Sequence, residues 1–271
     1  MRSPYNRVVL LLVDIGNTNV VLGVYDGALL KAHWRLATDT TTTADEYGIL
    51  ITSLLNSAGI LPVHISAAIM SSVVPALTST FEALIEQHFH QRPLVVTAET
   101  DTGLIIRYAN PKEIGSDRLV NAAAAYDKYR RDLIVVDFGT ATTFCTITKE
   151  GEYLGGVIAP GLGISAEALF ARAAKLSKVE FIKPKSVIGT DTASSIQSGL
   201  LFGYAGLVDA LVRRIEQELG RSTYVIATGG LSTVISPETT SIQKIEPFLT
   251  LEGLALVYRR ASGNLTPSAW V

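Results

Sequence analysis

The sequence predicts an α/β protein built from two duplicated domains, and three observations support this fold class. Short apolar runs alternate with longer segments of helical character, as in proteins whose sheets are covered on both faces. The segment 13–19 (VDIGNTN) recurs at 136–142 (VDFGTAT), and each copy follows an apolar run. A length of 271 residues gives room for two domains of ordinary size. We therefore expect an N-terminal domain over 1–116 and a C-terminal domain over 117–271.

The expected strands are short apolar runs that end at small or polar residues. The first run, 8–13 (VVLLLV), stops at Asp14, and the run 133–136 (LIVV) stops at Asp137 in the same way. A continuous apolar run suits a strand that is buried on both faces. The full set of expected strands is 8–13, 20–25, 67–71, 94–97, 133–136, 142–147 and 224–228.

The expected helices are longer segments in which apolar residues recur at helical spacing. The segment 117–131 is rich in alanine, the residue with the highest helix propensity. The segment 192–219 has apolar residues on more than one face, which is typical of a helix that is buried or covered by another chain. The full set of expected helices is 44–58, 76–88, 117–131, 164–176, 192–219 and 251–262.

The composition excludes several classes of function. Lys and Arg number 23 and Asp and Glu number 25, so the chain lacks the basic excess of a broad nucleic-acid surface. The single cysteine, Cys145, excludes an internal disulfide and a cysteine-based zinc site, and it fits a reducing cytosol. The run 8–13 is too short for a signal peptide or a membrane span, and we expect no other stretch to qualify. These features predict a cytoplasmic protein that binds neither nucleic acid nor a membrane.

The hairpin that begins at Asp14 is the first candidate site. An apolar strand delivers this carboxylate to a glycine and three small polar residues, Asn17, Thr18 and Asn19. Glycine permits a tight turn and the close approach of a phosphate, and successive turn N–H groups can form an anion-binding nest. Because a carboxylate repels phosphate, Asp14 is better placed to hold Mg²⁺, directly or through water. The alternative is an ordinary hairpin turn, but the second copy at Asp137 favours two loops that together bind a polyphosphate.

A second candidate site lies at 115–118 (GSDR), where a loop enters the alanine-rich helix. We expect Ser116 to cap this helix and Asp117 to lie in its first turn. The helix dipole would hold the pKa of Asp117 low, which makes it a modest base that accepts the proton of a substrate hydroxyl. The alternative is an acidic residue that only stabilises the start of the helix.

A third motif, 228–230 (TGG), lies at the end of an expected strand. Because its two glycines have no side chains, a purine ring could approach the backbone there. The alternative is an ordinary turn.

Taken together, these motifs resemble those of the type III pantothenate kinases, bacterial enzymes of coenzyme A biosynthesis. The similarity runs nearly end to end, and the order of the motifs is specific to this family. The motifs are D-x-G-N-T at 14–18, S-x-V-P at 72–75, G-x-D-R at 115–118, D-x-G-T at 137–140, G-G-x-I-x-P-G at 155–161, G-x-x-T at 189–192 and T-G-G at 228–230. The resemblance implies the fold of the acetate and sugar kinase/Hsp70/actin superfamily, with two ribonuclease H-like domains and a nucleotide cleft between them. It also implies ATP-dependent phosphorylation of the pantothenate hydroxyl to 4'-phosphopantothenate, the first step of coenzyme A biosynthesis.

The resemblance implies roles for individual residues. Asp117 would be the catalytic proton acceptor for the pantothenate hydroxyl, and Asp14 would support Mg²⁺. Asp137 would hold a monovalent cation, K⁺ or NH₄⁺, and the active form would be a homodimer whose pantothenate pocket lies against the partner subunit. The residues implied to contact ATP are Asp14, Ile15, Gly16, Asn17, Thr18, Asn19, Val20, Val21 and Thr140. Those implied to bind pantothenate are Tyr108, Gly115, Ser116, Asp117, Arg118 and Thr192.

The sequence departs from the family pattern at two positions. The family usually has Ala where Ser116 stands, a small change that we expect the site to tolerate. It often has Asn where Asp191 stands, and Asp191 adds a negative charge beside Thr192 on that side of the pocket.

Two other functions remain open: a non-catalytic relative that keeps the fold, and a phosphatase or polyphosphate hydrolase in which water replaces the alcohol. The three intact motif aspartates oppose the first alternative, and the 115–118 and 189–192 motifs favour an alcohol over water.

Overall fold

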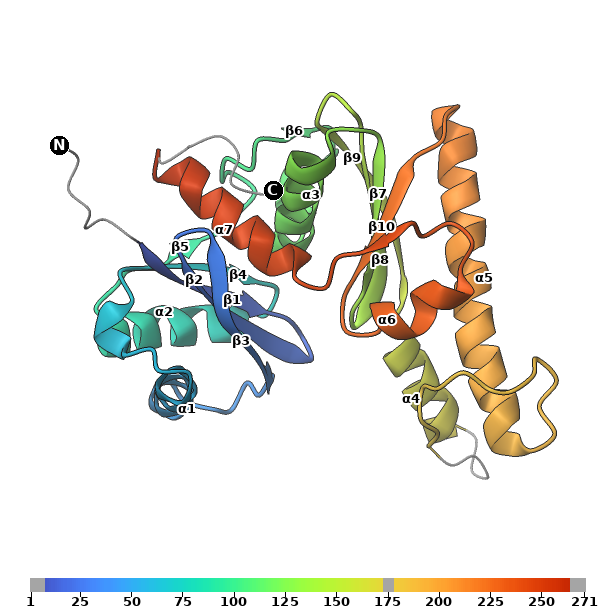
Figure 1. Ribbon diagram of the computed structural model, residues 1–271, viewed down its shortest axis with the longest axis horizontal. Helices are drawn as coiled ribbons and strands as arrows, with labels where there is room; N and C mark the ends of the chain where they lie inside the picture. Colours follow the sequence, from blue (N-terminus) through green and yellow to red (C-terminus); the bar gives the residue numbers. More distant parts are fainter. Residues whose placement is uncertain (1–7, 173–177, 264–271) are drawn as a thin grey trace. The chain divides into compact units, whose positions relative to one another are not determined.

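The computed structural model describes residues 8–172 and 178–263 (Figure 1). These residues form two compact units. The first unit contains the described residues within Met1–Leu104, Ala109–Ala124 and Thr250–Val271, and the second contains those within Ile105–Tyr108 and Ala125–Leu249. The last helix of the chain therefore belongs to the first unit, although the sequence that leads to it belongs to the second.

A five-stranded sheet forms the centre of the first unit. Its strands are β1 (Val9–Ile15), β2 (Asn19–Asp26), β3 (Leu29–Ala37), β4 (Ala67–Ser72) and β5 (Leu94–Val95), in the order β3-β2-β1-β4-β5. The first three strands form an antiparallel meander, whereas β4 is parallel to β1 and β5 is parallel to β4. The end of β1 therefore lies between the start of β2 and the end of β4.

A six-stranded sheet forms the centre of the second unit. Its order is β11-β10-β7-β8-β9-β6. The strands are β6 (Ile105–Ile106), β7 (Leu133–Phe138), β8 (Ala141–Ile147), β9 (Glu152–Pro160), β10 (Tyr224–Thr228) and β11 (Lys244–Ile245). Strands β7, β8 and β9 form an antiparallel meander, and β10 and β11 continue the sheet in parallel beside β7.

The two sheets repeat one strand pattern, which confirms the duplication predicted from the sequence. A meander of three strands followed by two parallel strands occurs in both, and among the strands of the described residues only β6, at the edge beside β9, has no counterpart. Asp14 in β1 lies in register with Ser71 of β4, and Asp137 in β7 lies in register with Thr228 of β10. The two motif aspartates therefore occupy equivalent positions in two ribonuclease H-like sheets.

Helices cover both faces of the first sheet. Because side chains alternate along a strand, Leu11 and Val13 of β1 face one side and Leu10 and Leu12 face the other. The first side packs on α1 (Ala44–Ser57) and α2 (Pro75–Phe89). The second packs on α3 (Ser116–Tyr129) and α7 (Leu249–Ala261). This double covering explains why the run 8–13 is apolar throughout.

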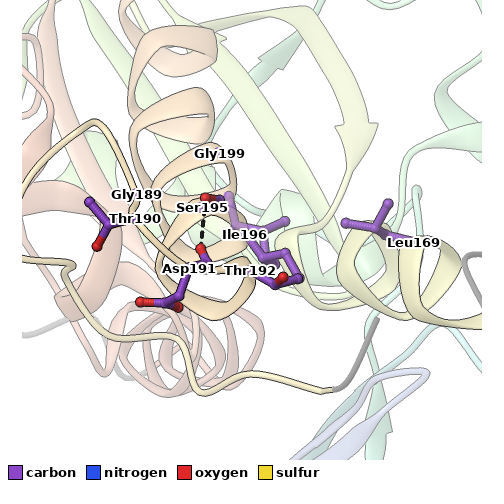
Figure 2. A pocket seen from close by; sticks show the side chains of 9 residues that line it. Leu169, Gly189, Thr190, Asp191, Thr192, Ser195, Ile196 and Gly199 are labelled. Carbon is purple, nitrogen blue, oxygen red and sulfur yellow. Dashed lines mark hydrogen bonds between the residues drawn. The ribbon is translucent and has the colours of Figure 1, made fainter. Parts of the chain in front are cut away.

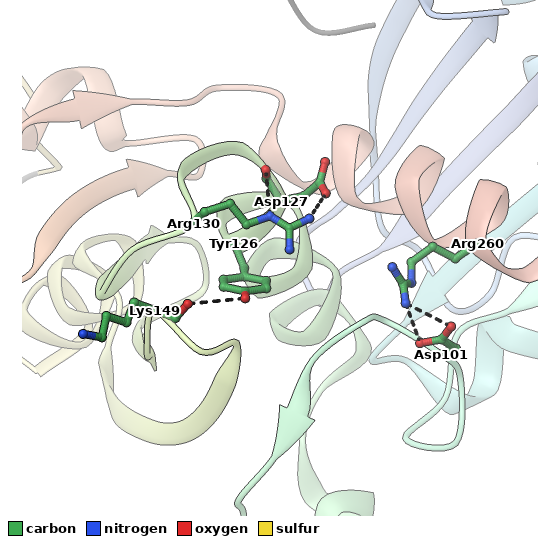
Figure 3. A network of polar contacts seen from close by, with 6 residues as sticks. All are labelled: Asp101, Tyr126, Asp127, Arg130, Lys149 and Arg260. Atoms are coloured by element: carbon green, nitrogen blue, oxygen red, sulfur yellow. Dashed lines mark hydrogen bonds and ion pairs between the residues drawn. The ribbon is translucent and has the colours of Figure 1, made fainter. Parts of the chain in front are cut away.

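Close contacts fix α7 in the first unit. A Cβ atom at Gly253 would lie 2.1 Å from the carbonyl oxygen of Val120, so only glycine permits α7 to cross α3 at this distance. Thr250 donates a hydrogen bond to Asn121 of α3 at 2.8 Å. Arg260 contacts both carboxylate oxygens of Asp101 at 3.2 Å (Figure 3).

The core of the second unit lies between its sheet and two helices, α4 (Leu162–Arg172) and α5 (Thr192–Leu219). Phe138 and Phe144 are buried against these helices. The loop after β8 packs on a tyrosine: Gly151 has a φ of +84° beside the ring of Tyr126, whose hydroxyl donates to the Lys149 carbonyl at 3.4 Å (Figure 3). The short helix α6 (Ser232–Ile235) follows β10.

Most expected elements are confirmed, with small shifts at their ends. The helix 192–219 has the predicted bounds, and 117–131 becomes Ser116–Tyr129. The helix expected at 164–176 begins earlier, at Leu162, and residues 173–176 lie outside the described residues. Strands β3, β6, β9 and β11 were not expected from the sequence.

Among the described residues, α5 is long and apolar enough to cross a membrane by length and composition alone. The expectation that no stretch would qualify is therefore wrong for this helix. Leu201, Val208 and Val212 of α5 are buried in the core of the second unit. Core helices of soluble proteins meet the same length and composition criteria.

Candidate functional site

The first candidate site is the turn between β1 and β2. Asp14 is the second-to-last residue of β1, and one of its oxygens accepts a hydrogen bond from the Ser71 hydroxyl at 2.6 Å. The amide of Gly16 donates to the carbonyl of Asn19 at 3.0 Å, which closes the turn. Thr38, the residue after β3, makes two hydrogen bonds to the backbone of this turn. Its hydroxyl donates to the Gly16 carbonyl at 2.6 Å and its amide donates to the Thr18 carbonyl at 3.1 Å.

These contacts set the direction of the peptide groups in the turn. The C=O and N–H of a trans peptide point in opposite directions, and the described chain has no cis peptide bond. Because the Gly16 and Thr18 carbonyls point to Thr38, the amides of Asn17 and Asn19 point away from it. Successive backbone amides of a turn can together bind an anion such as a phosphate.

The second candidate site is the start of α3. The Gly115 carbonyl accepts the amides of Arg118 and Leu119 at 3.1 and 3.2 Å, and Asp117 lies in the first turn, as predicted. One oxygen of Asp117 accepts the Arg118 amide at 2.8 Å. A Cβ atom at Gly115 would lie 2.4 Å from this oxygen, so glycine leaves the room that the carboxylate occupies.

The prediction of a low pKa for Asp117 is wrong. Burial of the carboxylate raises its pKa, and the amide and positive charge of Arg118, which favour the ionised form, do not outweigh this effect. A carboxylate with a raised pKa is a stronger base than an ordinary aspartate. The site therefore suits proton removal better than the sequence suggested.

The prediction that Ser116 caps the helix is also wrong. Ser116 is the first residue of α3, and its hydroxyl contacts β4 instead of the helix. It accepts the amide of Ser72 at 3.0 Å and donates to the Ser72 carbonyl at 3.2 Å. A hollow of about 440 Å³ opens beside these residues, lined by Ser72, Val73, Val96, Thr97, Ala98, Glu99, Lys112, Glu113, Ile114, Gly115 and Ser116.

The second unit carries the repeated hairpin. Asp137 is the second-to-last residue of β7, and the turn that contains Thr140 is one residue shorter than the first turn, since Phe138 pairs with Thr142 whereas Ile15 pairs with Val20. Gly229 has a φ of +89°, and a Cβ atom there would lie 2.4 Å from a carboxylate oxygen of Asp137. Gly161 donates to the Thr140 carbonyl at 3.0 Å. Small residues of the 155–161 and 228–230 motifs thus pack directly on the hairpin.

Tyr108 and Thr192 lie at separate places in the second unit. Tyr108 follows β6, and its ring lies against Gly155 and 6.4 Å from the ring of Tyr153. Thr192 is the first residue of α5, at a hollow of about 640 Å³ (Figure 2). The residues that line this hollow are Leu169, Gly189, Thr190, Asp191, Thr192, Ser195, Ile196, Gly199 and Leu200.

The structure explains the aspartate at position 191. Its side chain caps α5 by accepting the Ser194 amide at 2.8 Å, and this hydrogen bond is the main reason that its pKa is lowered. Asparagine is an equally good N-cap, which accounts for the exchange between the two residues. The carboxylate of Asp191 beside Thr192 therefore stabilises the start of α5.

Within the part of the chain that the structure describes, no three His, Cys, Asp or Glu side chains gather into a group that could hold a metal ion. A Mg²⁺ ion at Asp14 would therefore take most of its ligands from phosphate and water oxygens. This is the usual coordination of Mg²⁺ in nucleotide sites.

The structure brings the two predicted sites of the first unit together through β4. Ser71 contacts Asp14, and the next residue, Ser72, contacts Ser116. In the second unit, Asp137 and Thr140 share a hairpin, whereas Tyr108 and Thr192 lie elsewhere. The sequence did not indicate Thr38 or the contact of Ser71, because both join residues far apart in the chain.

Comparison with known proteins identifies the family. The model of the type III pantothenate kinase family matches residues 10–214. The chain belongs to the type III pantothenate kinase family. A type III pantothenate kinase from Geobacter sulfurreducens is 53% identical over 251 residues, which cover 93% of this chain and 98% of that protein. Another from Syntrophus aciditrophicus is 52% identical and is covered along its full length.

A solved structure supports the fold. A conserved Baf family protein from Campylobacter jejuni superposes with a TM-score of 0.58 at 17% identity, covering 94% of this chain and all of that one. At this identity the likeness concerns the fold alone. The family assignment rests on the sequence relatives.

Proposed function

We propose that this chain transfers the γ-phosphoryl group of ATP to the hydroxyl of pantothenate, giving 4'-phosphopantothenate in the first step of coenzyme A biosynthesis. The observation that carries the reaction is membership of the type III pantothenate kinase family across most of the chain. Kinases of this kind use ATP with a divalent metal ion, and positioning and charge neutralisation supply most of the catalysis.

The first unit would supply the phosphate turn and the base. The segment 14–21 would contact the ATP phosphates, with backbone amides of the turn such as those of Asn17 and Asn19 as donors. Asp14 would hold Mg²⁺ directly or through water, which neutralises phosphate charge. Asp117 would accept the proton of the pantothenate hydroxyl as the oxygen attacks the γ-phosphorus, and its raised pKa supports this role.

The second unit would supply a monovalent cation site and a further ATP contact. Asp137 would hold K⁺ or NH₄⁺, and Thr140 on the same turn would contact ATP. The donor types fit, because a carboxylate and backbone carbonyls are oxygen ligands that suit hard cations. Gly229 leaves the room that the Asp137 carboxylate occupies, because a Cβ atom there would lie 2.4 Å from one of its oxygens.

The residues that would bind pantothenate are Tyr108, Gly115, Ser116, Asp117, Arg118 and Thr192. Gly115 and Ser116 line a hollow in the first unit, and Thr192 lines a hollow in the second. The Ser116 hydroxyl is committed to Ser72, so Ser116 would contact the substrate through its backbone or Cβ.

We also propose a homodimer in the cytoplasm. The second unit exposes Val187 (67%) and Ile188 (81%), large apolar side chains close in sequence to the start of α5. On α5 itself, Gly199, Gly203 and Gly206 face open space, since a Cβ atom on any of them would meet nothing within 4 Å. Small residues at this spacing let a second helix approach closely, and exposed apolar side chains favour association.

The reaction is tested by measuring ADP formation with Mg²⁺, K⁺ and ATP, in the presence and absence of pantothenate. A pantothenate kinase forms ADP only when pantothenate is added. Equal ADP formation without pantothenate would indicate hydrolysis by water. No ADP in either mixture, with ATP binding retained, would indicate a non-catalytic relative.

The homodimer is tested by Gly203→Arg, which fits the open space of a single chain but would block a close helix contact. Gln217→Arg, at an exposed position near the end of α5, is the matched control. Light scattering should show a dimer for the wild type and the control and a monomer for Gly203→Arg. A monomeric wild type at assay concentration, with full activity, would contradict the proposal.

A further inference from the structure

Arg35 of β3 lies in one row with Asp14 across the first sheet. Asp14 of β1 is in register with Val21 of β2, and Val21 is in register with Arg35. Residues that are in register on neighbouring antiparallel strands have their side chains on the same face of the sheet. Neighbouring strands are about 4.8 Å apart, so the Cα atoms of Asp14 and Arg35 lie roughly 10 Å apart with only Val21 between them.

The packing of β3 shows to which face Arg35 belongs. Its neighbours Trp34 and Leu36 are half-buried against the core beneath α1 and α2. Because side chains alternate along a strand, Arg35 points to the opposite face. Val21 packs into the second core, on the side of α3 and α7, which confirms that the row of Asp14, Val21 and Arg35 lies on this opposite face.

The charge of Arg35 has no use within the first unit. Its side chain is exposed, and among the described residues it makes no hydrogen bond or ion pair. Lys31, on the same strand, instead has its ammonium group 3.9 Å from a carboxylate oxygen of Asp26. A guanidinium group presents a planar fork of N–H donors that matches the oxygens of a phosphate. The side chain of Arg35 is therefore available to an anionic ligand beside the turn after Asp14.

We propose that Arg35 binds the phosphate groups of ATP opposite Asp14. The proposal rests on the proposed function, in which the phosphates lie at the turn after β1. Asp14 would hold the metal ion on one side of the phosphates, and Arg35 would donate N–H groups to phosphate oxygens from the other side, above Val21. Asp14 and Asp117 both belong to the first unit, so a cation in the same unit reduces the repulsion between these carboxylates and the phosphates.

The alternative is that Arg35 only protects the edge of the sheet. Strand β3 lies at this edge, and charged side chains on an edge strand prevent it from pairing with another chain. The chain contains a matched control, because Lys31 is also a charged, exposed side chain of β3. Lys31 lies four residues from Arg35, which is about 13 Å along the strand and away from the turn.

The experiment compares Arg35→Gln with Lys31→Gln by steady-state kinetics in which MgATP and pantothenate are varied in turn. We expect Arg35→Gln to lower kcat/KM for MgATP by about tenfold to a hundredfold, the effect of losing a hydrogen bond to a charged group. The KM for pantothenate should change by less than about twofold. Lys31→Gln should keep the wild-type values. Equal kcat/KM values for MgATP in the two variants would overturn the proposal.

Two further variants keep a charge at the edge of the sheet. Arg35→Lys and Arg35→Glu should both unfold at the wild-type temperature, because the side chain is exposed. We expect kcat/KM for MgATP to fall in the order wild type, Arg35→Lys, Arg35→Gln, Arg35→Glu, since lysine lacks the planar fork and glutamate repels phosphate. Wild-type activity in Arg35→Glu would show that the edge charge alone matters and would overturn the phosphate contact.

Equilibrium binding separates this proposal from the proposed function. Arg35→Gln should bind the non-hydrolysable analogue MgAMPPNP about tenfold more weakly than Lys31→Gln does, and equal affinities would overturn the contact. This measurement holds whether or not pantothenate is the acceptor. A wild type that binds MgAMPPNP but does not phosphorylate pantothenate would overturn the proposed function. An active wild type with equal variants would overturn the role of Arg35 alone.

Discussion

Asp117→Asn separates a catalytic base from a structural residue at a helix start. Asparagine has the same shape, and its side-chain oxygen still accepts the Arg118 amide that Asp117 accepts at 2.8 Å. Burial raises the pKa of Asp117, which means that the folded state disfavours its charge. Replacing the carboxylate by a neutral amide should therefore leave the unfolding temperature unchanged or higher.

The expected loss of activity follows from the raised pKa. General bases contribute about 10²–10⁴-fold to a rate, which corresponds to about 2.7–5.5 kcal/mol of activation free energy. A base strengthened by burial belongs in the upper half of this range, so kcat should fall by about 10³-fold or more. The KM for pantothenate should change little, because the proton is transferred only as the oxygen attacks.

The assay is ADP release across pH for the wild type and Asp117→Asn. The base must be ionised to act, so wild-type kcat/KM should fall as pH drops through the raised pKa of Asp117. This acid limb should lie above the pKa of an ordinary aspartate, about 3.9. The Asn variant should lack the limb. A kcat close to wild type, or an unchanged limb in the variant, would refute the assignment of Asp117 as the base.

Three further predictions concern other residues. Thr38→Val removes the hydroxyl that holds the Gly16 carbonyl and should raise the KM for ATP by about threefold to tenfold in steady-state kinetics, with the KM for pantothenate unchanged. Asp137→Ala should abolish the stimulation of the rate by K⁺ over Na⁺, and retained stimulation would contradict the cation site. Burial alone would raise the pKa of Asp209, but the hydrogen bonds from Ser241 and Thr240 together outweigh it, so the pKa is lowered in the folded protein. The ionised carboxylate therefore stabilises the folded state at a pH above the pKa that Asp209 has in the unfolded chain. This stability is lost as the pH falls through the lower pKa of the folded state. Urea unfolding from about pH 7 to pH 3 should show a smaller loss for Asp209→Asn than for the wild type.

Strands buried on both faces were predictable from the sequence, and half-exposed strands were not. The run that forms β1 is apolar throughout because helices cover both faces of its sheet, and the four apolar residues 133–136 of β7 are all buried. Strand β3 (LLKAHWRLA) has alternating partial burial at the sheet edge and includes charged residues. Strand β9 contains Gly155 and Gly156, which weaken the strand signal in the sequence.

The site was predictable where local chemistry defines it. Local sequence patterns point to all three motif aspartates. Asp14 and Asp137 each end an apolar run just before a glycine, and Asp117 lies at the start of an alanine-rich helix. The partners of these residues depend on the fold: Ser71 is 57 positions from Asp14, and Ser116 is 44 from Ser72. The raised pKa of Asp117 has the same origin, because burial depends on segments that a local pattern does not include.

The identity of the phosphoryl acceptor tests the central claim most directly. The protein is incubated with MgATP, K⁺ and pantothenate, and the products are observed by ³¹P NMR together with the mass of the modified pantothenate. The proposed function predicts one new phosphomonoester resonance on pantothenate, formed in equal amount with ADP. Inorganic phosphate in place of that resonance, with pantothenate unchanged, would contradict it.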